Sequence, residues 1–235
     1  MNSNRRIFRD RRGTIGIEAA IVLIAFVVVA SAVAYVIINM GFYAAQKSKE
    51  TIGRGVDSAS SSLELDGSVI GRVNKTGVCV EYLIIPVRLS VGKSQVDLSN
   101  QTVMISVFAN NFTLADIYIG ELEHEVKNEY EEKYGNYIRG EDPQLEDVIK
   151  FLNGTFREEG RLKDVAVSVV YNDDGDSVLE LNEKAFIVIQ LNSTGHTLKS
   201  YDVFKVEIKP GTGAALTIVR QVPPGLLNES YVDLG

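Results

Sequence analysis

The sequence predicts an α+β protein, in which a long N-terminal apolar α-helix precedes an Ig-like antiparallel β-sandwich with small helical insertions. Three patterns support this fold. The 28 residues from Ala19 to Gln46 carry no charge, and as a helix they would extend about 42 Å. Eight later segments have the composition of strands and end at turn residues. Apolar residues recur at helical spacing in two short stretches among them.

Composition and charge exclude several classes of protein. Of the 235 residues, 45% are apolar and 23% are charged, which fits neither a disordered chain nor a polytopic membrane protein. The formal net charge is −7, with +4 on residues 1–13 and therefore −11 on the remainder. An acidic body argues against nucleic acid as a partner. The single cysteine, Cys79, excludes an internal disulfide.

The N-terminal apolar segment is too long for a secretory signal peptide, whose apolar region has about 7 to 15 residues. Its helical length exceeds the hydrocarbon thickness of a bilayer, about 30 Å. Five arginines precede it and the acidic remainder follows it, which predicts a cytoplasmic N terminus and an exported body. The simplest hypothesis is a single-pass membrane anchor.

Three features go beyond what an anchor needs. A carboxylate, Glu18, lies at the start of the apolar segment, where it is costly without a partner. Large apolar side chains, 16 between Ile21 and Tyr43, cover every face of the helix and leave no polar stripe for solvent. Small residues recur at four-residue spacing, which lets helices approach closely: Gly16 and Ala20, Ala30 and Ala34, Gly41 and Ala45. We therefore expect this helix to be surrounded by other apolar groups and not by water.

Residues 11–32, RRGTIGIEAAIVLIAFVVVASA, resemble the N terminus of archaeal flagellins, or archaellins, which belong to the type IV pilin-like superfamily. Residues 213–225, GAALTIVRQVPPG, are similar to the end of these proteins. The resemblance covers residues 11–52 and 207–235. It implies that a prepilin-type peptidase recognises Arg11, Arg12 and Gly13 and cuts before Thr14, leaving 222 residues.

The resemblance also implies an organisation and a function. Residues 1–13 would be a leader peptide removed on processing, residues 14–55 a helix that crosses the membrane before assembly and forms the filament core afterwards, and residues 56–235 an outer β-sandwich domain. The chain would polymerise, alone or with other archaellins, into an extracellular archaellum filament for swimming. An assembly ATPase and a membrane platform would be its export partners. No enzymatic activity is implied.

Finer boundaries follow from local signals. We expect the helix to stop at Gly53 or Gly55, before a serine-rich linker at residues 58–62. Residues 172–176 predict a hairpin turn. Two short helices are expected on the sandwich, one from Leu122 to Tyr134 and one with Pro143 at its first position. The expected strands are 63–73, 78–89, 103–108, 165–171, 178–181, 186–191, 203–208 and 215–222.

Six Asn-x-Ser/Thr sequons indicate N-linked glycosylation of an exported protein. Chance placement of the asparagine, serine and threonine residues would give about 1.6 sequons. The competing interpretation is that polar loops contain these residues by coincidence. The six asparagines are Asn74, Asn100, Asn111, Asn153, Asn192 and Asn228.

No cofactor other than glycans is expected. Asp173, Asp174 and Asp176 are weak candidates for a calcium site, but their spacing does not fit the EF-hand loop, and a plain turn is the preferred interpretation. The only two histidines have no cysteine near them in sequence, which argues against zinc.

Glu18 supports the most specific assembly hypothesis. Cleavage after Gly13 would create an amino group on Thr14, which could pair with the Glu18 carboxylate of a neighbouring subunit and set the axial register. The alternatives are a position at the membrane surface or recognition by the peptidase. Two other functions also stay open, an adhesive type IV pilin and a single-pass membrane-anchored extracellular domain.

Overall fold

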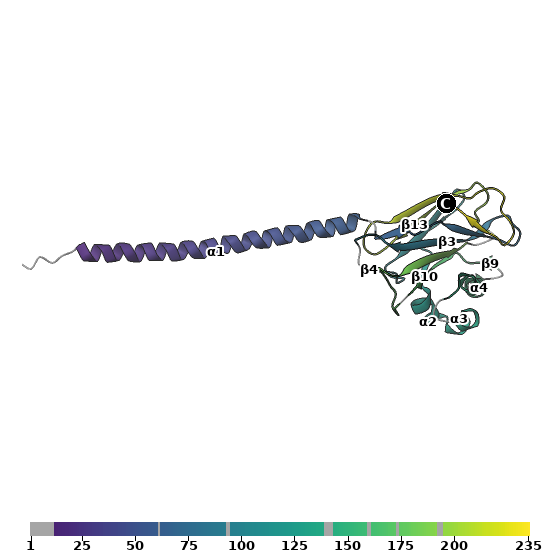
Figure 1. The fold of residues 1–235 in the computed structure, drawn as a ribbon, viewed down its shortest axis with the longest axis horizontal. Helices are drawn as coiled ribbons and strands as arrows, with labels where there is room; N and C mark the ends of the chain where they lie inside the picture. The colour runs from purple at the N-terminus through teal and green to yellow at the C-terminus, as the bar shows by residue number, and fades with distance from the viewer. Residues whose placement is uncertain are drawn as a thin grey trace, which may run out of the picture. The chain divides into compact units, whose positions relative to one another are not determined.

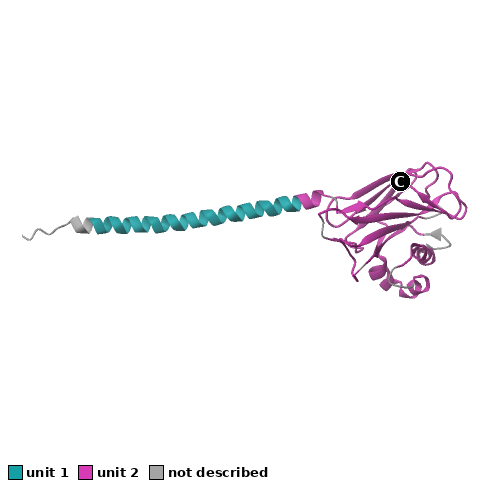
Figure 2. Cartoon of the chain, viewed as in Figure 1, with its two compact units in different colours: residues 1–55 teal, residues 56–235 magenta. Residues whose placement is uncertain are grey.

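The computed structural model describes residues 12–60, 62–92, 95–138, 143–158, 161–172, 174–191 and 195–235. The chain divides into two compact units, residues 1–55 and residues 56–235 (Figure 2). The helix α1 (Arg12–Ala59) makes up the described part of the first unit (Figure 1). All the described strands belong to the second unit.

The helix α1 runs without interruption for 48 residues. It passes Gly53 and Gly55, so the predicted end is wrong by about one turn. Neither glycine adopts the left-handed backbone conformation that terminates helices. Glu50 also forms ion pairs with Lys47 at 2.9 Å and Arg54 at 2.5 Å, and such pairs three and four residues apart support a helix.

The described residues of the second unit form four β-sheets. The largest has seven strands in the order β15-β2-β3-β12-β10-β7, with β1 also paired to β3, and the next has the order β14-β13-β5-β6. The two small sheets are β11-β4 and β8-β9. The strands are β1 (Leu63–Leu65), β2 (Ile70–Val73), β3 (Val80–Leu89), β4 (Gln95–Asp97), β5 (Met104–Ala109), β6 (Thr113–Leu114), β7 (Tyr118–Glu121), β8 (Arg157–Glu158), β9 (Arg161–Leu162), β10 (Val165–Tyr171), β11 (Val178–Glu180), β12 (Lys184–Gln190), β13 (Val203–Lys209), β14 (Leu216–Gln221) and β15 (Tyr231–Asp233).

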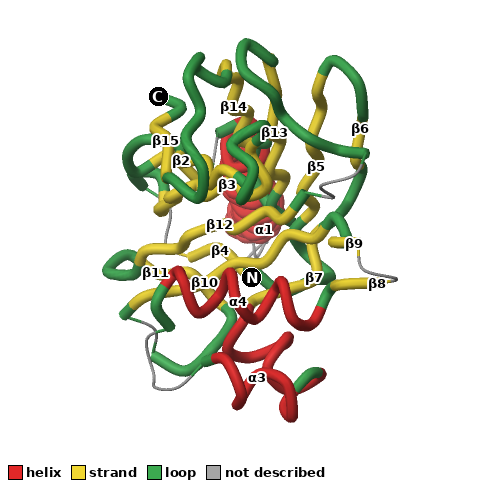
Figure 3. The backbone as a smooth tube through the Cα atoms, turned by 90° about the vertical axis from the view of Figure 1, so that its right-hand side faces the viewer, coloured by secondary structure: helices red, strands yellow, loops and turns green. Residues whose placement is uncertain are grey.

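The seven-stranded sheet is buried on both faces. On β3, Leu83 and Ile85 pack into the core shared with the four-stranded sheet, whereas Tyr82 and Ile84 pack against the helices. Figure 3 shows α3 (Glu131–Tyr137) and α4 (Leu145–Thr155) on one side of this sheet and the four-stranded sheet on the other. Because a strand covered on both faces needs apolar residues at most positions, the central strands β10 and β12 lack a regular polar alternation.

The helices between β7 and β8 form a third layer beside the two large sheets. They are therefore more than the surface decoration that the sequence predicted. They comprise the π-helix η1 (Leu122–Val126), α2 (Lys127–Glu129), α3 (Glu131–Tyr137) and α4 (Leu145–Thr155). The amphipathic helix α4 buries Val148, Ile149, Phe151 and Leu152. It starts two residues after Pro143, and Gln144 precedes its first turn, so the predicted first position was wrong.

Two strand predictions need correction. The expected strand 63–73 is divided into β1 and β2 by Asp66 and by Gly67, which has a φ of +130°. Residues 172–176 do not join a hairpin, because β10 pairs with β12 whereas β11 pairs with β4. The antiparallel prediction holds for the described pairs except β10 with β7, which are parallel.

Candidate assembly segment and modification sites

The side chains of α1 are exposed from Gly16 to Ala59. They include 19 large apolar side chains, each between 52% and 71% exposed. The shallow hollows on α1 are lined by its own side chains, one by Glu18, Ala19, Val22, Leu23 and Phe26. Ridges and hollows of this kind receive side chains of a second helix. The residues are Ile17, Ile21, Val22, Leu23, Ile24, Phe26, Val27, Val28, Val29, Val33, Tyr35, Val36, Ile37, Ile38, Met40, Phe42, Tyr43, Ile52 and Val56.

This exposure is too large for an isolated water-soluble chain. Covering the 16 large side chains from Ile21 to Tyr43 is worth at most about 25 to 50 kcal/mol. Within the described residues, one helix is long and apolar enough to cross a membrane, Gly16–Ala59, in which a window of 18 residues has a mean hydropathy of 3.0. A lipid bilayer or a bundle of like helices could therefore surround α1.

The predicted processing motif lies at the beginning of the described chain. Arg11 is outside the described residues, and Arg12, Gly13 and Thr14 fall in the first turn of α1. Glu18 is exposed on the next turn. The structure therefore leaves the Glu18 carboxylate accessible to a group from another molecule.

Five of the six sequons lie in described parts of the second unit, and Asn192 lies outside them. Asn111 is exposed between β5 and β6, and Asn100 is exposed at a turn before β5. Asn153 is half-buried on α4, and the hydroxyl of its sequon residue Thr155 is buried without a hydrogen-bond partner. Asn111 and Asn100 are therefore more accessible than Asn153, and Asn228 is exposed as they are.

Asn74 and Asn228 belong to two loops that lie together. The Asn74 side-chain oxygen accepts hydrogen bonds from the N–H groups of Val78 and Cys79 at 2.9 and 3.4 Å. The backbone N–H of Glu229 donates to the Asn74 carbonyl at 3.2 Å. The Asn74 side chain therefore closes its own turn through its oxygen. An N-linked glycan is attached to the amide nitrogen, so it would leave this acceptor in place.

A buried carboxylate was not predicted from the sequence. Glu121, fully buried at the end of β7, caps η1 by accepting hydrogen bonds from the backbone N–H groups of Glu123 at 3.0 Å and His124 at 2.6 Å. Burial raises the pKa of Glu121 to about 7, although the two N–H groups act in the opposite direction. Acidic residues at the start of a helix indicate in the sequence where a capping carboxylate could lie, but the burial of that carboxylate depends on tertiary packing.

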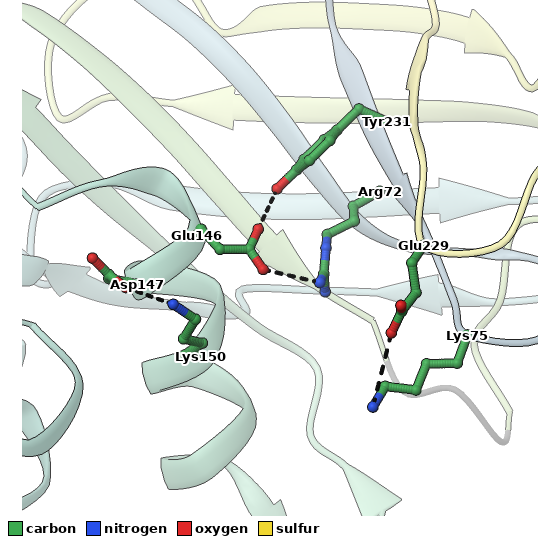
Figure 4. Close-up of polar contacts among 7 residues, drawn as sticks. All are labelled: Arg72, Lys75, Glu146, Asp147, Lys150, Glu229 and Tyr231. Carbon is green, nitrogen blue, oxygen red and sulfur yellow. Dashed lines mark hydrogen bonds and ion pairs between the residues drawn. The ribbon is translucent and has the colours of Figure 1, made fainter.

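A polar contact connects the C-terminal strand to the helical layer. Arg72 on β2 and Tyr231 on β15 both point toward Glu146 on α4 (Figure 4). The Arg72 guanidinium lies 3.2 Å from one carboxylate oxygen, and the Tyr231 hydroxyl donates to the other at 2.6 Å. The two contacts give each oxygen of the Glu146 carboxylate a hydrogen-bond donor at the edge of the sheet. The arrangement therefore has a structural role.

The described residues contain no group of three histidine, cysteine or acidic residues arranged to hold a metal ion. Asp173 lies outside them, and the Asp176 carboxylate accepts a hydrogen bond from the Val178 N–H at 2.7 Å, as in an ordinary turn. His196 pairs with Asp164 at 2.6 Å. No nucleophile accompanies this pair among its described contacts.

The fold defines a class of protein in which a long, exposed apolar N-terminal helix precedes a β-rich unit with its own core. Comparisons with known proteins give the family. The model of the archaeal-type flagellin family matches residues 13–220. The chain is 40% identical over 227 residues to the probable flagellin 1 of Aeropyrum pernix, covering 97% of this chain and 100% of that protein. The chain belongs to the archaeal-type flagellin family.

Further relatives agree with this assignment. The probable flagellin 2 of Archaeoglobus fulgidus is 32% identical over 245 residues, covering 97% of this chain and 98% of the relative. The structure of the archaeal flagellum of Methanospirillum hungatei has a TM-score of 0.50 at 24% identity and covers 92% of this chain and 98% of that one. The crystal structure of flagellin FlaB1 from Methanocaldococcus jannaschii has a TM-score of 0.53 at 15% identity, covering 73% and 95%. The family is structural, and the chain is not an enzyme.

Proposed function

We propose that this chain is the subunit of an extracellular archaellum filament, made as a membrane-held precursor and polymerised through α1. The observation that carries this proposal is the exposure of every described side chain of α1 from Gly16 to Ala59, in a chain whose second unit has its own complete core. Family membership supports the same function.

The precursor stage follows from the solvent requirements of α1. The bilayer holds the apolar helix until assembly, with the arginine-rich head on the cytoplasmic side. Transfer from lipid to a helix bundle gains mainly packing, because lipid tails are as apolar as the side chains of α1. Export therefore requires external work, which an assembly ATPase and a membrane platform would supply. Once assembled, subunits should leave the filament very slowly.

Processing by a prepilin-type peptidase would remove residues 1–13. The cut between Gly13 and Thr14 removes the charged head that would otherwise enter an apolar core, at a large desolvation cost. It also creates the amino group that could pair with Glu18 of a neighbouring subunit. A bulky residue in place of Gly13 should block the cut and keep the precursor in membranes. Assembled, correctly trimmed protein from that variant would contradict this assignment.

The exported domain would carry N-linked glycans on its acidic surface. Asn100, Asn111 and Asn228 are the exposed asparagines among the described sequons and are therefore the best placed. Replacement of each occupied asparagine by glutamine should lower the subunit mass by one glycan. A mass unchanged in all six variants would reject glycosylation.

Swimming motility, driven by a motor at the base of the filament, is the proposed role of the polymer. A filament that mediates attachment, like an adhesive type IV pilus, would share the same export route. A deletion strain that loses swimming but still attaches supports the archaellum, and the reverse result supports the pilus. A membrane-anchored domain would retain residues 1–13 and stay monomeric in detergent.

A further inference from the structure

Four hydrogen-bonding side chains interrupt the apolar surface of α1 between Ala19 and Ala45. They are Ser31, Tyr35, Asn39 and Tyr43, each four residues after the one before. We call these four residues the polar row. The sequence predicted a helix without any polar stripe, and that prediction is corrected to one narrow row over residues 31–43. The two tyrosines combine a large apolar ring with a polar hydroxyl, so they belong to the apolar surface as well as to the row.

The row forms a single ridge, because α1 is helical throughout Arg12–Ala59. Residues four apart differ by about 40° around a helix and by about 6 Å along it. Tyr35, Asn39 and Tyr43 therefore lie within about 80° of the circumference and about 12 Å of the axis. Rows of this spacing are the ridges that fit into the grooves of neighbouring helices.

Only one member of the polar row has its hydrogen bond within the described chain. The Ser31 hydroxyl donates to the Val27 carbonyl at 2.7 Å. The side chains of Tyr35, Asn39 and Tyr43 have no hydrogen-bond partner among the described residues, and the two tyrosines are 70% and 71% exposed. These three side chains are therefore available to a second molecule.

The environment of an assembled α1 requires such a partner. In a bundle of apolar helices no water reaches the amide of Asn39, and an unsatisfied buried amide is costly. We propose that Tyr35, Asn39 and Tyr43 hydrogen-bond to α1 of a neighbouring copy and thereby set the axial register between subunits. This inference rests on the proposed function, in which α1 forms the filament core.

A position at the membrane surface is the competing explanation. Asn39 lies about 30 Å along the helix from Ala19, which places it near the outer boundary of the hydrocarbon in the precursor. Tyrosines at that boundary anchor helices at any angle around the axis. The interfacial explanation does not require Tyr35, Asn39 and Tyr43 to share one ridge, whereas contact with the groove of a second helix does. The spacing therefore favours the neighbouring copy.

The test uses filaments of the full chain assembled in cells. Asn39→Leu removes the amide and keeps a side chain of similar size, so we expect fibres with mixed axial registers by electron microscopy, as buried asparagines specify register elsewhere. Tyr35→Phe combined with Tyr43→Phe removes only the hydroxyls, and we expect subunit release in detergent to accelerate about threefold to tenfold. The matched control is Ser31→Ala, because its hydroxyl is bonded within its own helix.

Uniform fibres from Asn39→Leu together with unchanged subunit release from the tyrosine variant would overturn the register proposal while leaving the filament function intact. Normal fibres combined with a loss of precursor from membranes would assign the row to the membrane surface instead. A wild-type chain that never forms fibres would reject the proposed function itself, which is a different result from either of these.

Discussion

The guanidinium of Arg72 on β2 lies 3.2 Å from the carboxylate of Glu146 on α4. The contact joins the edge of the seven-stranded sheet to the helical layer, and the Tyr231 hydroxyl on β15 donates to the same carboxylate at 2.6 Å. Glu146 therefore connects three elements that are far apart in sequence. The contact also explains how the short C-terminal strand β15 is held at the edge of the sheet.

Replacement of Glu146 by alanine should destabilise the second unit by about 1 to 2 kcal/mol, because it leaves Arg72 and Tyr231 without their acceptor. Arg72 already has a buried Nε atom without a partner. Calorimetric unfolding of intact filaments measures the change. Glu229→Ala is the control, since Glu229 pairs with the exposed Lys75 at 3.8 Å and should cost less than about 0.5 kcal/mol. Equal effects of the two variants would contradict a special role of Glu146.

The buried Glu121 predicts a pH dependence of stability. Its pKa is raised to about 7 in the folded domain, above the ordinary value for an exposed glutamate, so the folded state binds the proton more tightly than the unfolded state does. Stability should therefore fall as the pH rises from about 4.5 to about 7 and then level off. Unfolding temperatures of the wild type and of Glu121→Gln across this range provide the measurement. Because the variant cannot titrate, an identical slope in both proteins would show that Glu121 is not responsible.

Truncation of Phe151 should strongly destabilise the second unit. Phe151 is fully buried in the core between α4 and the sheet, and its ring lies edge-on to those of Tyr134 and Phe156. Phe151→Ala should cost about 3 to 5 kcal/mol through the cavity that it creates. Leu181→Ala is the matched control, because Leu181 is 74% exposed and should change stability by less than about 0.5 kcal/mol. A mild effect at Phe151 would mean that the helices are only loosely attached to the sheet.

Occupancy of the sequons should follow their accessibility. Asn111 is exposed next to a two-residue strand, whereas Asn153 is half-buried on α4, and the threonine hydroxyl of its sequon is buried. Glycopeptide mass spectrometry should therefore find higher occupancy at Asn111 than at Asn153. The opposite order would indicate that glycans are attached before the domain folds.

The parts of the fold that depend on local patterns could be predicted from the sequence. The helix over residues 14–55 follows mainly from the uncharged apolar run at residues 19–46, and most strands follow from β-branched residues bounded by turns. The end of α1 at Ala59 could not be predicted, because ion pairs around Glu50 support the helix through two glycines.

Pairing and layering could not be predicted because they depend on distant residues. The segment 172–176 has the composition of a hairpin turn, but β11 pairs with β4 at residues 95–97 instead of with its neighbour β10. The two-sided burial of β3 and β10 could not be predicted, because it depends on the helices that cover one face of the sheet. The polar row was readable in the sequence, and its unpaired state required the structure.

The central claim is that trimmed subunits surround one another through α1. N-terminal mass spectrometry of fibres sheared from cells, combined with their electron microscopy, tests it most directly. We expect fibres whose subunits begin at Thr14 and whose centre is filled by α1. Recovery of the chain only as dispersed membrane protein that begins at Met1 would contradict the claim.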